Sequence, residues 1–341
     1  MPTIIKPTRT FTDELLRHYR LQGDAPADAA ITAVVDQHGK DELRNLMRWL
    51  ADPQDLSLDR QPEPVQQFIR EFAYLPAWAD KRKMKQGLAF FWKHAGAVAL
   101  SLGCYSLPYC YLAANGAQVL WMTERIKNDT YRRLQETGEF VFGVMNEKEW
   151  TNGAIFTRIL KIRLIHAASR WFVLNSGRWN MDWGYPVNQE DMAGTNGAFS
   201  YIVIRGLRKA NITTSEAEEE AYLHLLNVVG YINGVADELL PQNLREAFHL
   251  DRIIAQRQFE ASEAGQGLTK ALLRALEQQA GSPSAYNLAA AQMRFFLGDA
   301  LADMLAIPDV PVETRLVTLT TKLPVFTDLL SRSTSATIAK P

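Results

Sequence analysis

Residues 161–170 place cationic and metal-ligating side chains inside a strongly apolar stretch, Lys-Ile-Arg-Leu-Ile-His-Ala-Ala-Ser-Arg. In a helix, Arg163 and Arg170 would lie on nearly the same face, and His166 about 60° away from them. Basic groups on one side of a buried helix are costly unless an anion or a metal meets them. A haem would satisfy all three, because imidazole can ligate the iron and guanidinium groups can meet the propionates or fix the ligand. We therefore take a haem site at His166 as the hypothesis to test.

A lone histidine on an apolar helix is, taken by itself, more often a satisfied core or interface residue than a metal ligand. The flanking Arg163 and Arg170 favour ligation, since positive neighbours suit a dianionic porphyrin and help to keep the imidazole neutral. The other histidines are scattered along the chain, and only His94, beside an apolar run, could join a site.

A second polar group occurs about thirty residues upstream, where Arg133 and Thr137 would share a helix face with Glu136 on its edge. These three side chains could form a polar pocket inside an apolar cavity. Neighbouring polar residues such as Arg132 and Glu139 equally suit an ordinary solvated helix, and the residues alone favour that simpler interpretation.

Other common chemistries have no matching motif in the chain. There is no glycine-rich dinucleotide or phosphate loop, no His-Glu-x-x-His and no Gly-x-Ser-x-Gly. A di-iron bundle needs paired Glu-x-x-His motifs, and the nearest candidate, Glu220 with His224, has the wrong spacing and no twin. The net charge of −1, without a basic stripe, argues against a nucleic-acid partner.

The 341 residues, 47% of them apolar and 8 of them tryptophan, indicate a folded chain with a substantial core. Helical periodicity dominates and convincing alternating strands are absent, so we predict an all-α fold. We expect a helical extension or lid over residues 1–80, a large multi-helix domain over 81–330, and a flexible tail over 331–341. Further expectations are a loop over 176–196, in which Asn188 caps a helix, and a helix over 312–330.

Residues 95–122 carry no charge and are long enough to cross a bilayer. Because Pro108 and several polar residues interrupt the run, we predict two buried helices broken near Ser106, with a membrane span as the minority alternative.

Cys104 and Cys110 are too far apart for a Cys-x-x-Cys site and are expected to be free and buried, as in a reducing compartment. The amino terminus lacks an export signal, which favours the cytoplasm.

Four segments in this order resemble a known family. They are Arg133-Leu-Gln-Glu-Thr, Arg163-Leu-Ile-His-Ala-Ala-Ser-Arg, Pro186-Val-Asn-Gln-Glu-Asp-Met followed by Phe199-Ser, and Gly234-Val-Ala-Asp-Glu-Leu-Leu-Pro. Together they are similar to the catalytic domain of the rubber oxygenases, a family that includes latex clearing protein and the endoplasmic-reticulum-bound oxygenase of mycophenolic acid biosynthesis. The resemblance runs from about residue 85 to 245.

The resemblance implies an all-α, globin-like core that holds haem b through a single protein ligand. By motif that ligand is His166, with Arg163 and Arg170 as its basic neighbours. The distal motif of latex clearing protein, Arg-x-x-Lys-Thr, falls on residues 133, 136 and 137, so a glutamate stands where that enzyme has lysine. A carboxylate suits proton transfer, or a hydrogen bond to bound oxygen, better than iron coordination. Cleavage of polyisoprene itself is therefore not what we expect.

The resemblance thus predicts a haem b-dependent oxygenase that uses dioxygen on a small apolar, unsaturated or isoprenoid-like substrate. Glu136 would act as the distal acid or base, Arg133 would orient it, and Thr137 would hydrogen-bond to the distal network. Two alternatives stay open: a haem protein with peroxidase-like or sensor activity, and a helical lipid-binding protein without a cofactor.

Overall fold

The structure, a computed structural model, describes residues 9–122 and 130–310. Within these residues every regular element is helical and no strand forms, which confirms the predicted all-α fold. An isolated antiparallel β-bridge joins Ala113 and Phe259. None of the described helices is both long and apolar enough to cross a membrane.

The first half of the chain contains these helices: α1 (Asp13–Arg20), α2 (Ala25–His38), α3 (Lys40–Ala51), α4 (Glu63–Phe72), α5 (Lys81–Lys93), α6 (Ala95–Ser101), the π-helix η1 (Leu102–Ser106), α7 (Leu107–Tyr111), α8 (Ala114–Met122), α10 (Thr130–Val144), α11 (Glu147–Asn152) and α12 (Ala154–Leu174).

The second half continues with the short 3₁₀ helix η2 (Met181–Trp183), α13 (Gln189–Phe199), α14 (Tyr201–Lys209), α15 (Glu216–Ile232), the 3₁₀ helix η3 (Asp237–Leu239), α16 (Leu244–Gln258), α17 (Glu263–Ala280), α18 (Ser284–Leu297) and α19 (Asp299–Met304).

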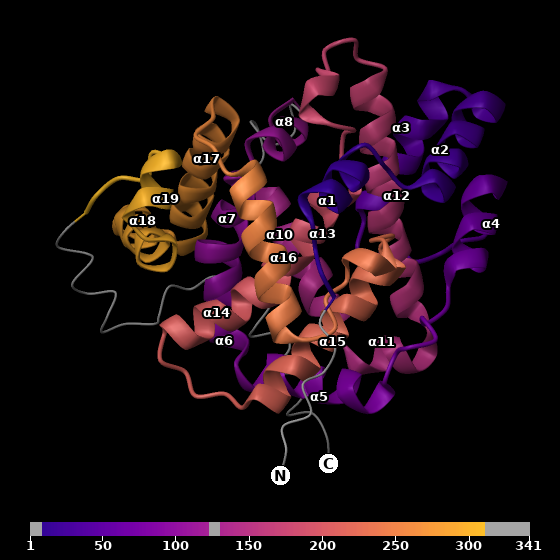
Figure 1. The fold of residues 1–341 in the computed structure, drawn as a ribbon. Helices are drawn as coiled ribbons and strands as arrows, with labels where there is room; N and C mark the ends of the chain where they lie inside the picture. The colour runs from indigo at the N-terminus through magenta and orange to yellow at the C-terminus, as the bar shows by residue number, and fades with distance from the viewer. Residues whose placement is uncertain (1–8, 123–129, 311–341) are drawn as a thin grey trace.

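Helix α12 lies at the centre of the packing. The amino-terminal helices α2, α3 and α4 contact it on one side, and α8, α10, α11 and α15 contact it elsewhere. Figure 1 shows the amino-terminal helices grouped beside α12, with α17, α18 and α19 on the opposite side of the molecule. The residues predicted to carry the chemistry therefore sit on a helix that neighbours surround on several sides.

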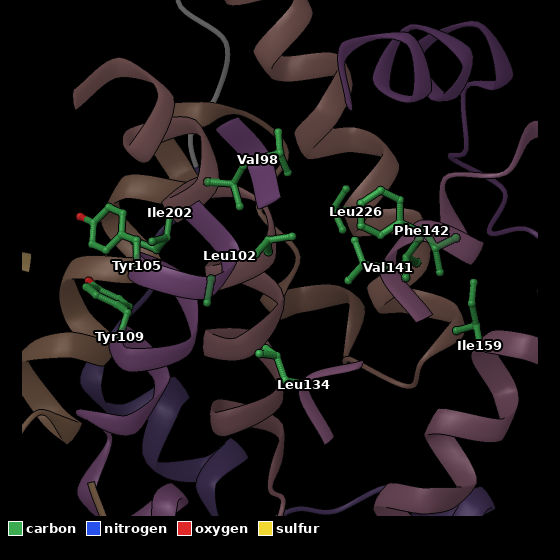
Figure 2. Packing of buried hydrophobic residues seen from close by; sticks show 14 of the residues in the cluster. Val98, Leu102, Tyr105, Tyr109, Leu134, Val141, Phe142, Ile159, Ile202 and Leu226 are labelled. Carbon is green, nitrogen blue, oxygen red and sulfur yellow. The ribbon is translucent and has the colours of Figure 1, made fainter. Parts of the chain in front are cut away.

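The main hydrophobic cluster extends from Ala27 on α2 to Ile307 beyond α19. Its members include Leu134 of α10, Ile159 of α12 and Leu226 of α15, which Figure 2 shows together with neighbouring core residues. Because α2, α3 and α4 contribute to this same cluster, the amino-terminal helices share their core with α12.

The uncharged stretch 95–122 differs from the prediction. The expected break near Ser106 is wrong, since α6, η1 and α7 follow one another without interruption. The Leu107 amide donates to the Leu102 carbonyl, a π-type bond, and this wider turn directly precedes Pro108, which has no N–H to donate. The helix ends instead near Ala113. Both cysteines are free; Cys104 is buried and Cys110 is half-buried.

Helix α13 begins earlier than expected, so the loop after α12 ends at Asn188. The side chain of Asn188 accepts a hydrogen bond of 2.9 Å from the Asp191 amide, which confirms the predicted cap. The helix predicted over 312–330 and the tail over 331–341 lie outside the described residues.

Candidate functional site

His166 lies near the middle of α12 and is half-buried. Its Nδ1 atom is fully buried and has no hydrogen-bond partner among the described residues. Burial, reinforced by the positive charges of Arg170 and Arg133 and opposed by Asp24, lowers the pKa of His166 to about 4. The imidazole is therefore neutral at ordinary pH and keeps a lone pair for a metal or a hydrogen-bond donor.

Arg163, one turn before His166, is fully engaged within the protein. Its Nε and Nη2 atoms donate to the two carboxylate oxygens of Asp24 at 2.6 and 2.9 Å, and its Nη1 atom lies 3.4 Å from the Ile232 carbonyl. The guanidinium group also lies over the Phe72 ring, 4.6 Å from its centre. A carboxylate of α2 thus already neutralises the charge of Arg163, which favours the alternative that this side chain fixes the ligand rather than meets a propionate.

Arg170, one turn after His166, is only partly engaged. Its Nε atom donates to Asp28 Oδ1 at 2.6 Å and its Nη1 atom to the Val187 carbonyl at 3.1 Å. Its Nη2 atom is buried and lacks an acceptor among the described residues. The pKa of Asp28 is raised because burial outweighs the opposing effect of Arg170. Arg170 therefore keeps one donor that an anionic group could take.

The three predicted residues on α10 divide between two environments. Arg133 is half-buried, and its charge acts on both His166 and Tyr111, so α10 brings a guanidinium group close to the histidine. Glu136 is half-buried and accepts a hydrogen bond of 3.1 Å from the exposed Arg132. Thr137 donates to the Arg133 carbonyl of its own helix at 2.9 Å. The structure thus brings Arg133 and His166 together, while Glu136 and Thr137 make local contacts on α10.

Sequence reasoning missed the carboxylates of Asp24 and Asp28. Both lie at the start of α2, where acidic residues normally face their own helix amides. The Asp24 side chain makes no such cap bond and pairs with Arg163 instead. A sequence signal was present in the two acidic residues around the helix-starting Pro26, but it also fits an ordinary helix start.

A second buried charge cluster supports the beginning of α13. Glu190 is fully buried and accepts from Arg257 Nε at 2.7 Å and from Arg20 Nη1 at 3.3 Å, while Asp191 accepts from Arg20 at 3.0 Å. These contacts link α1, α13 and α16. Asp191 also faces Gly116 of α8, where a Cβ atom would stand only 3.0 Å from the carboxylate carbon. The absence of a side chain at Gly116 thus leaves room for the Asp191 carboxylate.

A hollow of about 420 Å³ opens between α8 and the carboxy-terminal helices α17 to α19. Its lining combines apolar side chains such as Trp121 and Leu305 with the charged side chains of Glu263 and Lys270. Helix α8 contacts both α17 and α12. The hollow therefore lies against a helix that also touches the one carrying His166.

Comparison with known proteins shows the family of the chain. Residues 92–326 match the family described as "ER-bound oxygenase mpaB/B'/Rubber oxygenase, catalytic domain". The chain belongs to this family. The membership confirms the resemblance drawn from the four sequence segments and makes an oxygenase the class of enzyme to which the chain is related.

Two members of the family extend the comparison. A curated protein named rubber oxygenase, from Streptomyces sp. strain K30, is 27% identical over 314 residues, which is 86% of this chain and 73% of that protein. The solved structure of latex clearing protein in its closed state shares the fold with a TM-score of 0.74 at 22% identity, covering 91% of this chain and 84% of the other. The family match begins at Trp92, so Asp24 and Asp28 lie outside it.

Proposed function

We propose that the protein is a haem b-dependent oxygenase that uses dioxygen on a small apolar, unsaturated or isoprenoid-like substrate. The observation that carries the proposal is the His166 imidazole, held neutral on α12 with a buried nitrogen that no described residue satisfies. Within a chain of an oxygenase family, a neutral imidazole of this kind would be a suitable ligand for haem iron.

The residues around His166 fit this cofactor. Arg170 retains a buried donor for an anionic group, and the charge of Arg133 favours a negatively charged porphyrin nearby. Bound at His166, the haem would supply the activation of dioxygen, since such redox chemistry belongs to the cofactor. Arg163 serves instead to neutralise Asp24 and to fix α12 against α2.

The protein's own contribution on α10 is proton handling and orientation. We assign to the half-buried carboxylate of Glu136 the transfer of a proton to and from the reacting groups, with Arg132 as its ion-pair partner. Arg133 orients charge near His166. Thr137 is positioned by its bond to the helix backbone, and its oxygen can accept a hydrogen bond.

The hollow beside α8 offers an apolar substrate the aromatic and aliphatic surface of Trp121, Leu273 and Leu305, with the charged Glu263 and Lys270 in the same lining. The relative from Streptomyces is named for rubber. We propose a smaller substrate here because glutamate at position 136 replaces the lysine of the latex clearing protein motif.

The ligand assignment is tested by titrating hemin into the purified protein and into His166→Ala. The wild-type protein should bind one hemin with a sharp Soret band, and His166→Ala should lose this band or bind at least about 100-fold more weakly. His224→Ala is the matched control, since His224 lies on α15 and accepts the Asp80 amide at 2.9 Å. A wild-type Soret band in His166→Ala would remove the assignment.

The distal role is tested with Glu136→Gln, which should lower dioxygen consumption with an olefinic terpenoid by about 10²-fold and leave hemin binding unchanged. Glu139→Gln, on the same helix, is the control and should keep its activity. Unchanged turnover in Glu136→Gln contradicts the acid–base role. Peroxide-dependent dye oxidation without any dioxygen consumption would favour the peroxidase-like alternative.

A further inference from the structure

We propose that Asp24 and Asp28, at the start of α2, are positioning residues of the His166 site: through Arg163 and Arg170 they fix the part of α12 that presents the histidine. The inference rests on the proposed function, because it treats His166 as the ligand. It makes the amino-terminal helices part of the site, although the family match starts only at residue 92.

The first link joins Asp24 to Arg163 with two hydrogen bonds of 2.6 and 2.9 Å. Both groups are nearly inaccessible to solvent, with side-chain exposures of 3% and 9%. Asp24 occupies the N-cap position of α2, yet its carboxylate makes no bond to the amides of its own helix. A side chain that usually stabilises its own helix end is therefore used to hold α12.

The second link joins Asp28, one turn along α2, to Arg170. Asp28 Oδ1 accepts from Arg170 Nε at 2.6 Å, and its Oδ2 accepts from the Asp24 amide at 3.3 Å. The two carboxylates thus belong to one network at a single helix end. The partial positive charge of that helix end further stabilises both anions.

Two glycines allow α2 and its neighbours to close on these pairs. A Cβ atom at Gly23 would stand 2.9 Å from Asp28 Oδ2 and 3.1 Å from Arg170 Cδ. Gly234, with φ of +89°, faces Asp24 and Arg163, and its Cβ would stand 2.6 Å from Arg163 Nε. The Gln189 amide donates to the carbonyls of both glycines at 2.9 Å, which holds the two segments together.

The two paired arginines lie on either side of His166 along α12. Arg163 lies three residues before His166 and Arg170 four residues after it, about 4.5 and 6 Å along the helix axis. Anchors on both sides restrict the rotation and the sliding of this stretch of α12. With an ion pair on only one side, the other side of this stretch would be held by packing alone, and the imidazole would be less precisely placed.

The same helix provides a matched control. Arg158 donates two hydrogen bonds of 2.7 Å to Glu149 of α11, with side-chain exposures of 11% and 14%. Like the Arg170–Asp28 pair, it joins an arginine of α12 to a carboxylate of a neighbouring helix, but it lies eight residues from His166, about 12 Å along the axis. Loss of a charge there should affect stability without moving the histidine.

The test compares Asp28→Asn with Glu149→Gln in the full chain, with Asp28→Glu as the conservative variant. Asp28 is the better target because its side chain is 26% exposed, so its loss is less disruptive than that of Asp24. Three quantities are measured: the melting temperature without hemin, the hemin dissociation constant, and the electron paramagnetic resonance spectrum of the ferric complex. The spectrum reports the orientation of the axial imidazole.

Asp28→Asn should weaken hemin binding by about 10- to 100-fold and alter the ferric spectrum. Glu149→Gln should lower the melting temperature comparably and leave both hemin readouts at wild-type values, and Asp28→Glu should restore most of the affinity. Equal hemin losses in Asp28→Asn and Glu149→Gln, or no loss in Asp28→Asn, would overturn the inference alone. A wild-type protein that binds no hemin would overturn the proposed function and the inference with it.

Discussion

The two helices that carry the candidate site residues handle charge in opposite ways. On α12, Arg163 pairs with the buried Asp24 across more than a hundred residues of sequence. On α10, the half-buried Glu136 pairs with the exposed Arg132 of the preceding turn. The α12 pair therefore joins two distant helices, whereas the α10 pair joins two turns of one helix.

The two helices should therefore tolerate substitution to different degrees. A change on α12 strands a charge in the core, which is costly in any family member. A change on α10 exchanges one half-exposed side chain for another at little cost to folding. The glutamate at position 136, in place of the lysine of the latex clearing protein motif, is thus a change in chemistry that the fold accepts easily.

The largest expected contrast compares Arg163→Ala with Arg132→Ala. Arg163→Ala leaves Asp24 buried without a counter-charge and should lower the free energy of unfolding by about 3–5 kcal/mol. Arg132→Ala removes an exposed partner of Glu136 and should cost less than about 1 kcal/mol. Urea unfolding followed by circular dichroism measures both values.

The double variant Asp24→Asn with Arg163→Met controls for the stranded charge. It removes both ions together and should be more stable than Arg163→Ala. If Arg163→Ala and Arg132→Ala lose the same stability, the proposed difference between the two helices does not exist.

The sequence predicted the helical class, the helix that carries His166 and the Asn188 cap, because periodicity and capping are local signals. It could not predict that Asp24 meets Arg163, since an acidic residue at a helix start satisfies a local rule whether or not it has a distant partner. The same gap produced the propionate expectation: a buried cation needs an anion, but the sequence does not say which one.

The misplaced break in residues 95–122 has a similar cause. Proline is a reliable sign of a helix end, yet a π-turn before Pro108 lets the chain continue. The accommodation depends on a single shifted hydrogen bond, from Leu107 to Leu102, which composition and spacing do not encode.

A smaller effect concerns pH. The pKa of His166 is about 4 in the folded protein, against about 6.5 for an exposed imidazole, so between these values the unfolded chain binds more protons. The haem-free protein should therefore lose about 2 kcal/mol of stability through this group when the pH falls from 7.5 to 5.0. Urea unfolding at the two pH values measures the loss.

His166→Gln isolates this contribution, because glutamine does not titrate. The difference in stability between pH 7.5 and 5.0 should be about 2 kcal/mol smaller in His166→Gln than in the wild-type protein. If the change in stability between the two pH values is the same in both proteins, the imidazole titrates as an exposed group. That result would contradict the burial of His166 on α12.

The smallest effect on stability is expected at Thr137. Its hydroxyl bonds to the Arg133 carbonyl within α10, so Thr137→Val should lower the free energy of unfolding by less than about 1 kcal/mol and leave hemin affinity unchanged. Thr137→Ser keeps the hydroxyl and serves as the control. If the hydroxyl takes part in the distal network, dioxygen consumption should fall in Thr137→Val and stay near the wild-type rate in Thr137→Ser. A loss of turnover without a loss of stability would show that a local contact on α10 positions a group for catalysis, whereas equal activity in both variants would reduce Thr137 to an ordinary helix residue.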